Sequence, residues 1–245
     1  MYIAYLPKPA GEKVDKRKVN KFLQWYSAVT KDKYSIIAVP GYLSQAVSSI
    51  ETYLQNLKEI LAKKQKRKIG FLNGVNGHLS AAGGGIILDE HNKRLSTYNF
   101  DKIKLTPNNK IDHRKMMCFF EVKENKYDEI TLDNLEEFLE DIYIGAILIG
   151  SSNQSKTTYF EPYAKKGEAD IFMFDASEDF PKKNDKETEE EAVKRALLEN
   201  HLDDSVLSIL NDIVITKSFL GKGHEDTQEF FKSILRDILT NGLEK

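Results

Sequence analysis

Two mostly apolar runs, residues 116–122 and 144–149, constrain most strongly what this chain can fold into. Each has the composition of a strand that is buried in a sheet. Polar residues border both runs: His113 and Lys115 before the first, Ser151 and Asn153 after the second. Residues two apart on a strand project from the same face, so each polar pair is expected to emerge together. The sequence therefore predicts an imidazole, an ammonium, a hydroxyl and an amide at two strand ends, a combination suited to holding a phosphodiester.

Composition limits the class of protein. The chain has 245 residues, 40% of them hydrophobic and 30% charged, which fits one domain with an appendage in an ordinary soluble protein. No apolar run reaches the ~20 residues of a membrane span, and the N-terminus lacks a secretory pattern. We therefore expect a cytoplasmic protein that does not bind a membrane. Because the net charge is −2, any affinity for nucleic acid must come from a local basic patch.

Cysteine and histidine usage bears on redox and metal chemistry. The single cysteine, Cys118, excludes an intrachain disulfide and lies inside an apolar run, so we expect it to be a core residue. The five histidines are scattered, which argues against a Cys/His zinc cluster. The 38 acidic residues leave open a metal held by carboxylates. No cofactor is predicted.

The first third of the chain alternates between strand and helix patterns. Residues 34–39 are largely β-branched and apolar, and Ser44 is a candidate N-cap for a helix that continues to about Lys68. Residues 69–72 form a second short strand. Strand, helix and strand in this order predict a right-handed parallel crossover. Residues 74–85 are glycine-rich and predict a flexible loop, with a substrate-contacting loop as the alternative.

After residue 122 the chain continues with helix and strand patterns up to residue 174, and a polar segment follows. Residues 123–141 are acidic with a helical spacing of apolar residues, and residues 169–174 have a strand pattern. Residues 176–191 are polar and predict a linker. Residues 192–243 are expected to be largely helical, with a strand-like interruption at 213–216. The sequence leaves open whether this tail is a separate module or packs on the first part.

One ordered set of residues resembles the motif of the phospholipase D superfamily, above all of its small bacterial nucleases with a single motif copy. The set is His113-x-Lys115, Gly150-Ser151-x-Asn153 and then Glu168 at the start of a strand. The resemblance covers about residues 34–175. It implies an α/β fold with a mixed β-sheet flanked by helices, a catalytic domain at 1–175, and a linker with a largely helical extension at 176–245. Phe120 stands where the family usually has an aspartate, and the long spacing between histidine and glycine implies an insertion at about 123–141.

The resemblance also implies a role for each motif residue. His113 would attack phosphorus and form a phosphohistidine, while a second histidine protonates the leaving oxygen and then activates water. With one motif copy, that second group is His113 of another subunit, so a homodimer is implied. Lys115 and Asn153 would hold the nonbridging oxygens, and Ser151 would assist. Glu168 would orient the imidazole. This scheme requires no metal and no cofactor.

Further residues are candidates for substrate binding. A basic cluster stands at the end of the helix predicted from Ser44, where it fits either a solvated helix end or a contact with a phosphate backbone. It consists of Lys63, Lys64, Lys66, Arg67 and Lys68. Ser152 in the Gly-Ser loop and His78 in the glycine-rich loop are additional candidates.

The sequence favours a metal-independent phosphodiesterase, a DNA endonuclease of the restriction or defence kind. Two alternatives stay open. One is a hydrolase of phospholipids or other small phosphodiesters on the same scaffold, which the lack of a membrane-seeking segment disfavours. The other is a non-catalytic nucleic-acid-binding domain that has kept the fold, for which the residue at 120 and the acidic insertion argue.

Overall fold

The computed structural model describes most of the chain. The described residues are 1–13, 17–31, 33–40, 47–63, 65–72, 90–108, 114–123, 127, 129–151, 162–163, 167–175, 184, 186–188, 191–192, 195, 213–217 and 224–244. Everything stated below about the structure concerns these residues.

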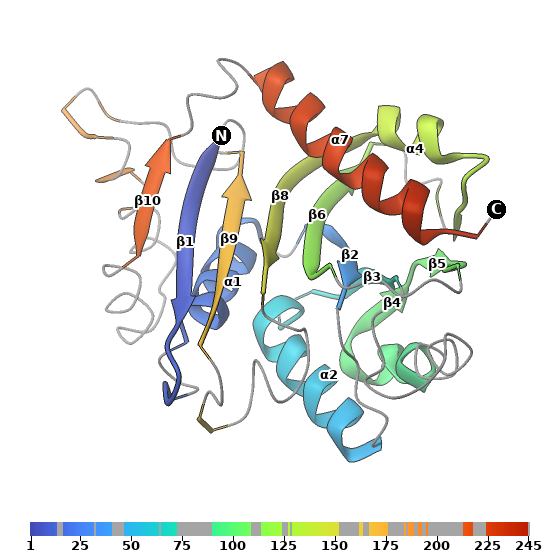
Figure 1. Cartoon of the computed structure of the whole chain (residues 1–245), viewed down its shortest axis with the longest axis horizontal. Helices are drawn as coiled ribbons and strands as arrows, with labels where there is room; N and C mark the ends of the chain where they lie inside the picture. Colours follow the sequence, from blue (N-terminus) through green and yellow to red (C-terminus); the bar gives the residue numbers. More distant parts are fainter. Residues whose placement is uncertain are drawn as a thin grey trace.

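An eight-stranded sheet forms the centre of the protein, in the order β10-β1-β9-β8-β6-β2-β3-β4 (Figure 1). From β10 to β2 all neighbours are antiparallel, whereas β2, β3 and β4 run parallel to one another. The sheet is therefore mixed, as predicted. Its strands are β1 (Tyr2–Lys8), β2 (Ser35–Val39), β3 (Arg67–Phe71), β4 (Phe100–Lys102), β6 (Met116–Val122), β8 (Ile142–Gly150), β9 (Glu168–Phe174) and β10 (Val214–Lys217).

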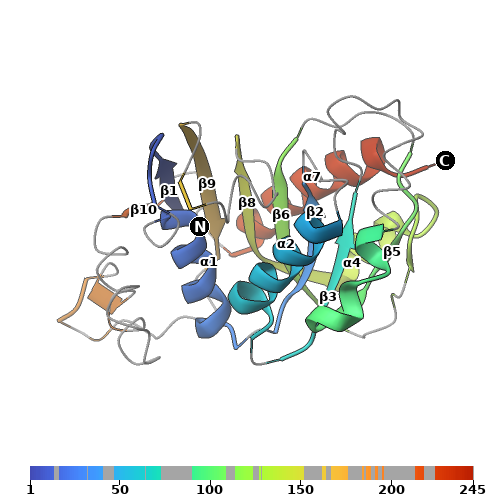
Figure 2. The same ribbon diagram turned by 90° about the horizontal axis from the view of Figure 1, so that it is seen from below.

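Helices cover both faces of this sheet (Figure 2). One apolar core joins one face to α1 (Lys18–Val29) and α2 (Val47–Leu61). The second core joins the other face to α4 (Leu135–Asp141) and α7 (His224–Gly242). The structure is thus an α/β fold in which helices flank a mixed sheet. A 3₁₀ helix, η2 (Leu95–Tyr98), precedes β4.

The parallel pairing of β2 with β3 confirms the predicted strand–helix–strand unit, but the helix is shorter than predicted. It ends at Leu61, and Arg67 and Lys68 already belong to β3. The expectation of a helix reaching about Lys68 was therefore wrong. Its apolar stripe stops at Leu61 because the following residues are basic, and the chain then turns back to pair with β2.

Segment 123–141 contains the expected helix in its second half. Before it, β7 (Glu129–Ile130) pairs with β5 (Lys104–Leu105) in a separate two-stranded sheet. In α4, Phe138 and Leu139 are buried in the same core as α7. The apolar spacing thus does mark the face that packs inward.

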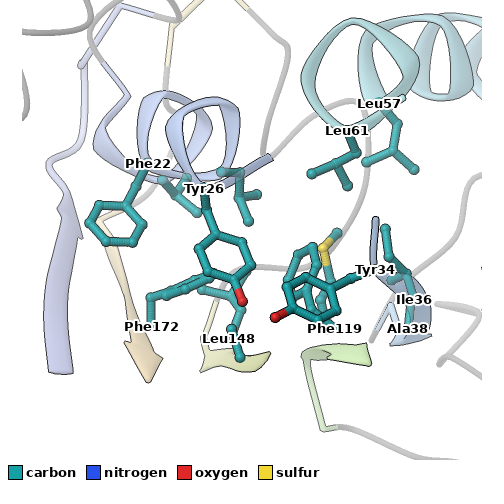
Figure 3. Close-up of a cluster of buried hydrophobic side chains, with 14 of the residues drawn as sticks. Phe22, Tyr26, Tyr34, Ile36, Ala38, Leu57, Leu61, Phe119, Leu148 and Phe172 are labelled. Atoms are coloured by element: carbon teal, nitrogen blue, oxygen red, sulfur yellow. The ribbon is translucent and has the colours of Figure 1, made fainter. Parts of the chain in front are cut away.

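Aromatic rings dominate the core under α1 (Figure 3). The Tyr26 ring lies 4.9 Å from that of Phe172 and 5.5 Å from that of Phe119, and it stacks on Tyr34 at 6.0 Å. These rings pass over Gly145, where the pairing of β6 with β8 shifts register. A Cβ at Gly145 would lie 2.5 Å from the Tyr34 ring, so the rings need glycine at this position. Buried aromatic pairs of this kind add to the stabilisation from area burial alone.

Cys118 is fully buried in the core beneath α7, as predicted from its position in an apolar run. Burial raises the pKa of its thiol, because the thiolate would lose its hydration there. Among the helices of the described residues, none combines the length and apolar character needed to cross a bilayer.

The C-terminal part shares the sheet and the core with the rest of the chain. The strand-like segment predicted at 213–216 is β10, which pairs with β1. Helix α7 is fixed to β8 through the buried Gln228 amide. Its Oε1 accepts a 2.9 Å hydrogen bond from the Ile144 N–H, and its Nε2 donates to the Ile144 carbonyl at 2.9 Å and to Asp175 Oδ2 at 3.3 Å.

Replacing Gln228 with alanine is expected to lower the free energy of unfolding by about 2–4 kcal/mol, because the buried N–H and C=O groups of Ile144 lose their hydrogen bonds to the Gln228 amide. Urea denaturation followed by circular dichroism measures this loss. Gln55→Ala is the matched control, since Gln55 is exposed on α2 and its Nε2 donates a 3.1 Å hydrogen bond to the exposed Glu59 Oε1. Equal losses in both variants would show that the Gln228 bridge contributes nothing specific.

Candidate active site

The two strands predicted to carry the motif meet at one end of the sheet. Strands β6 and β8 pair with Met116 opposite Ile149. The ladder continues one step further, because the Gly150 N–H donates a 3.2 Å hydrogen bond to the Lys115 carbonyl. Lys115, before β6, and Gly150, at the end of β8, are therefore neighbours.

Ser151 carries the contact on to the third strand. Its N–H donates to the Ala169 carbonyl at 3.0 Å. Its hydroxyl also donates to that carbonyl, at 3.2 Å, and accepts from the Ala169 N–H at 3.0 Å. Ser151 thereby ties the end of β8 to the start of β9, one residue from Glu168. In the structure, the Ser151 hydroxyl is hydrogen-bonded to the main chain of Ala169.

Lys115 and Glu168 emerge on the same face of the sheet. By strand alternation Lys115 shares a face with Met117 and Phe119, whereas Glu168 shares one with Phe172, and all three apolar residues belong to the core under α1 and α2. The motif lysine and the motif glutamate thus stand on the α1 side, separated by the end of β8.

Asp170 is a site residue that sequence reasoning missed. It is 2% exposed and pairs across the sheet with Gly150. A Cβ built on Gly150 would overlap Asp170 Oδ1 and lie 2.7 Å from the Ala169 carbonyl oxygen. The carboxylate therefore occupies the space above Gly150, between Glu168 and the strand of Lys115. An acidic residue two positions after Glu168, on the face of buried phenylalanines, was a signal that could have identified it.

Lys8 is the second residue that was missed. It ends β1 directly opposite Glu168, and its Nζ forms an ion pair with Glu168 Oε2. The side chains of Lys8 and Glu168 are only 4% and 15% exposed. Strand β1, which lies beside β9 in Figure 1, was not predicted, so nothing suggested this partner. The available signal was the strand-forming character of Tyr2, Ile3 and Tyr5 at the start of the chain.

The turn after β1 adds charge near this ion pair. Burial raises the pKa of the Glu12 carboxyl, while the positive charges of Arg17, Lys18 and Lys8 oppose that rise. Arg17 is fully buried just before α1. Cations thus outnumber carboxylates along the segment from Lys8 to Lys18.

Arg114 fixes the motif strand from the opposite face. Its Nη1 contacts Asp237 Oδ2 on α7 at 2.9 Å, and its Nη2 donates to the Ile238 carbonyl at 3.4 Å. The residue between His113 and Lys115 is therefore tied to the C-terminal helix. This bond couples the tail of the chain to the beginning of β6.

The described members of the predicted basic cluster do not line this site. Ile36 of β2 pairs with Phe119 of β6 and with Ile69 of β3, which places Arg67 at the far end of the sheet from Lys115. Arg67 is 2% exposed and cannot reach a phosphate backbone. Lys66 contacts Asp101 at 2.6 Å. Lys63 is exposed, and Lys68 lines a small pocket of about 180 Å³ with Lys33 and Glu121.

Five of the predicted site residues lie outside the described residues. They are His113, Asn153, Ser152, Lys64 and His78. Within the described ranges, no group of three or more metal-ligating side chains gathers in one place. No protein-family model matches the sequence, and no curated protein matches it either.

Proposed function

We propose that this chain is a metal-independent phosphodiesterase of the phospholipase D type that cleaves DNA through a phosphohistidine on His113. The observation that carries the proposal is the continuous main-chain contact from Lys115 through Gly150 and Ser151 to Ala169. It brings residues of three strands, up to 54 positions apart in the chain (169 − 115), to one end of the sheet. The arrangement of helices around a mixed sheet supports the same proposal.

The proposed reaction has two displacements. An imidazole nitrogen of His113 attacks phosphorus, the bond to the leaving oxygen breaks, and the imidazolium of His113 of the partner subunit protonates that oxygen. Water, deprotonated by the same partner imidazole, then breaks the P–N bond. A twofold axis at the sheet end would bring the two histidines together. The chain therefore acts as a homodimer in this proposal.

The remaining motif residues serve charge and orientation. The Lys115 ammonium and the Asn153 amide hold the nonbridging oxygens, whose negative charge grows in the transition state. Glu168 accepts a hydrogen bond from the other imidazole nitrogen and so fixes the tautomer that attacks. Ser151 assists by holding the Gly-Ser loop against β9, as its hydrogen bonds to Ala169 suggest.

Cleavage of plasmid DNA in excess EDTA tests the proposal. The purified protein is expected to cut at the same rate, within about twofold, with EDTA as with Mg²⁺, because imidazole is the nucleophile and Lys115 supplies the charge. A Mg²⁺-dependent restriction enzyme in the same buffers is the control that EDTA acts. Activity that vanishes in EDTA and returns with Mg²⁺ contradicts the proposal.

Two further outcomes of this experiment separate the alternatives. Hydrolysis of bis(p-nitrophenyl) phosphate without DNA cleavage would assign the chain to small phosphodiesters. Binding of a labelled duplex without turnover of either substrate would assign it to non-catalytic nucleic-acid binding. Neither result would be compatible with an endonuclease.

A further inference from the structure

We propose that Lys8 is a positioning residue for this reaction: its ammonium holds the Glu168 carboxylate in the orientation that grips the His113 imidazole. The inference rests on the proposed function and extends it to a residue outside the segment that resembles the family. Lys8 comes from β1, near the start of the chain, and is far in sequence from the rest of the site.

The first support is the contact itself. Lys8 and Glu168 are cross-strand partners, and Nζ of one meets Oε2 of the other. At 4% exposure the ammonium has little water to hydrate it, so the carboxylate is its counter-ion. A long lysine side chain on a surface would move freely, whereas this one is buried and paired with Glu168 of the neighbouring strand.

The second support is where the pair stands. Lys8 shares a face with Ala4 and Leu6, in the core under α1, and Glu168 shares that face with Phe172. Across the same sheet end follow Asp170, Gly150 and Lys115. Two ammonium groups therefore flank two carboxylates along one row. The Lys8 ammonium faces Glu168 from the far side of that row, so it acts on the reaction through Glu168.

The third support is the geometry of a carboxylate. Its two oxygens offer about four acceptor sites, so one oxygen can bind an ammonium while the other binds an imidazole N–H. A glutamate alone has three rotatable bonds, and a fixed partner removes that freedom before substrate arrives. Lys8 is this fixed partner, and the buried ion pair holds the Glu168 carboxylate in one orientation.

Lys8→Met tests the inference, because methionine keeps the length and removes the charge. We expect kcat for DNA cleavage to fall by about 10–100-fold while KM changes by less than about threefold, since orientation of the nucleophile is lost and substrate binding is not. Lys8→Arg is expected to restore most of the rate. Lys33→Met is the control, because Lys33 also forms a lysine–glutamate ion pair, with Glu121 3.2 Å away, but that pair is more exposed and lies at the other end of the sheet.

The contrary outcomes are distinct. A folded Lys8→Met protein with the kcat of the unaltered chain overturns the inference. A raised KM with unchanged kcat also overturns it, because Lys8 would then bind substrate directly. A drop in kcat that Lys33→Met shares shows only a general loss of stability and counts against the inference as well.

A second comparison covers the case in which Lys8→Met alone does not fold. Lys8→Met is added to Glu168→Gln, which removes both charges and leaves neither buried alone. If Lys8 acts only through Glu168, the double variant keeps the kcat of Glu168→Gln within about twofold. A further tenfold loss overturns the inference. His113→Ala with full activity would instead overturn the proposed function, so the two failures remain distinguishable.

Discussion

Replacing His113 with alanine is expected to reduce kcat for DNA cleavage by at least about 10⁴-fold, because in the proposed mechanism His113 is the group that forms the covalent intermediate. Single-turnover cleavage of a fluorescent duplex measures the effect. The matched control is Arg114→Gln, the next residue along, which faces α7 and contacts Asp237. We expect it to lower stability while keeping kcat within about fivefold. Equal losses in both variants would show that His113 has no special chemical role.

Trapping the intermediate gives the same prediction a chemical readout. Rapid acid-free quenching with SDS of the unaltered protein on ³²P-labelled DNA is expected to leave label on the protein. A phosphoramidate bond is stable in base and cleaved by acid, which distinguishes it from a phosphoserine or phosphotyrosine ester. The His113→Ala protein should retain no label. Acid-stable label on the unaltered protein would place the nucleophile elsewhere.

Mixing subunits tests whether one site needs two copies of His113. When unaltered and His113→Ala chains are refolded together, activity should follow the square of the unaltered fraction, because only dimers with two imidazoles turn over. A protein in which each chain carries its own complete site would show a linear dependence. The square law therefore supports a shared site, and a straight line rules it out.

The parts of the fold that were predictable follow from local patterns. Strands β6 and β8 coincide closely with the apolar runs identified in the sequence, because a strand buried on both faces is largely apolar, and β9 coincides with the strand pattern identified at residues 169–174. The parallel β2–β3 pair follows from the strand–helix–strand order. Patterns on this scale involve only neighbours in the chain, which is why sequence alone reveals them.

The missed parts depend on contacts between distant residues. Lys8 and Glu168 are 160 positions apart, and the pair exists only because β1 inserts between β9 and β10. Gln228 bridges 84 positions to Ile144. A single sequence does not indicate which strands, far apart in the chain, will pair with each other. The glycine of the Gly-Ser loop is a partial exception: the sequence pointed to it, but only the structure gives the reason, which is the Asp170 carboxylate above it.

Because the Asp170 carboxylate occupies the space above Gly150, Gly150→Ala is expected to lower both the rate of DNA cleavage and the stability of the protein. The added methyl would overlap the Asp170 carboxylate and lie 2.7 Å from the Ala169 carbonyl, so the start of β9 must move away from β8. Glu168 would move with it. A displacement of about 1 Å at the groups that orient a nucleophile can cost 10²-fold in rate, and overpacking costs about 1–3 kcal/mol in stability. Cleavage kinetics and thermal unfolding measure the two losses.

Gly167→Ala is the matched control for this experiment, since it adds the same methyl group next to Glu168. At that position the nearest atoms to a Cβ would be the Ala10 nitrogen at 3.9 Å and the Lys8 carbonyl oxygen at 4.0 Å, which are ordinary contacts. We expect this variant to keep kcat within about twofold and its stability within about 0.5 kcal/mol. If Gly150→Ala cleaves DNA as fast as Gly167→Ala, the contact between β8 and β9 does not hold the site together. The hydrogen bonds that join Lys115, Gly150, Ser151 and Ala169 would then not be needed for DNA cleavage.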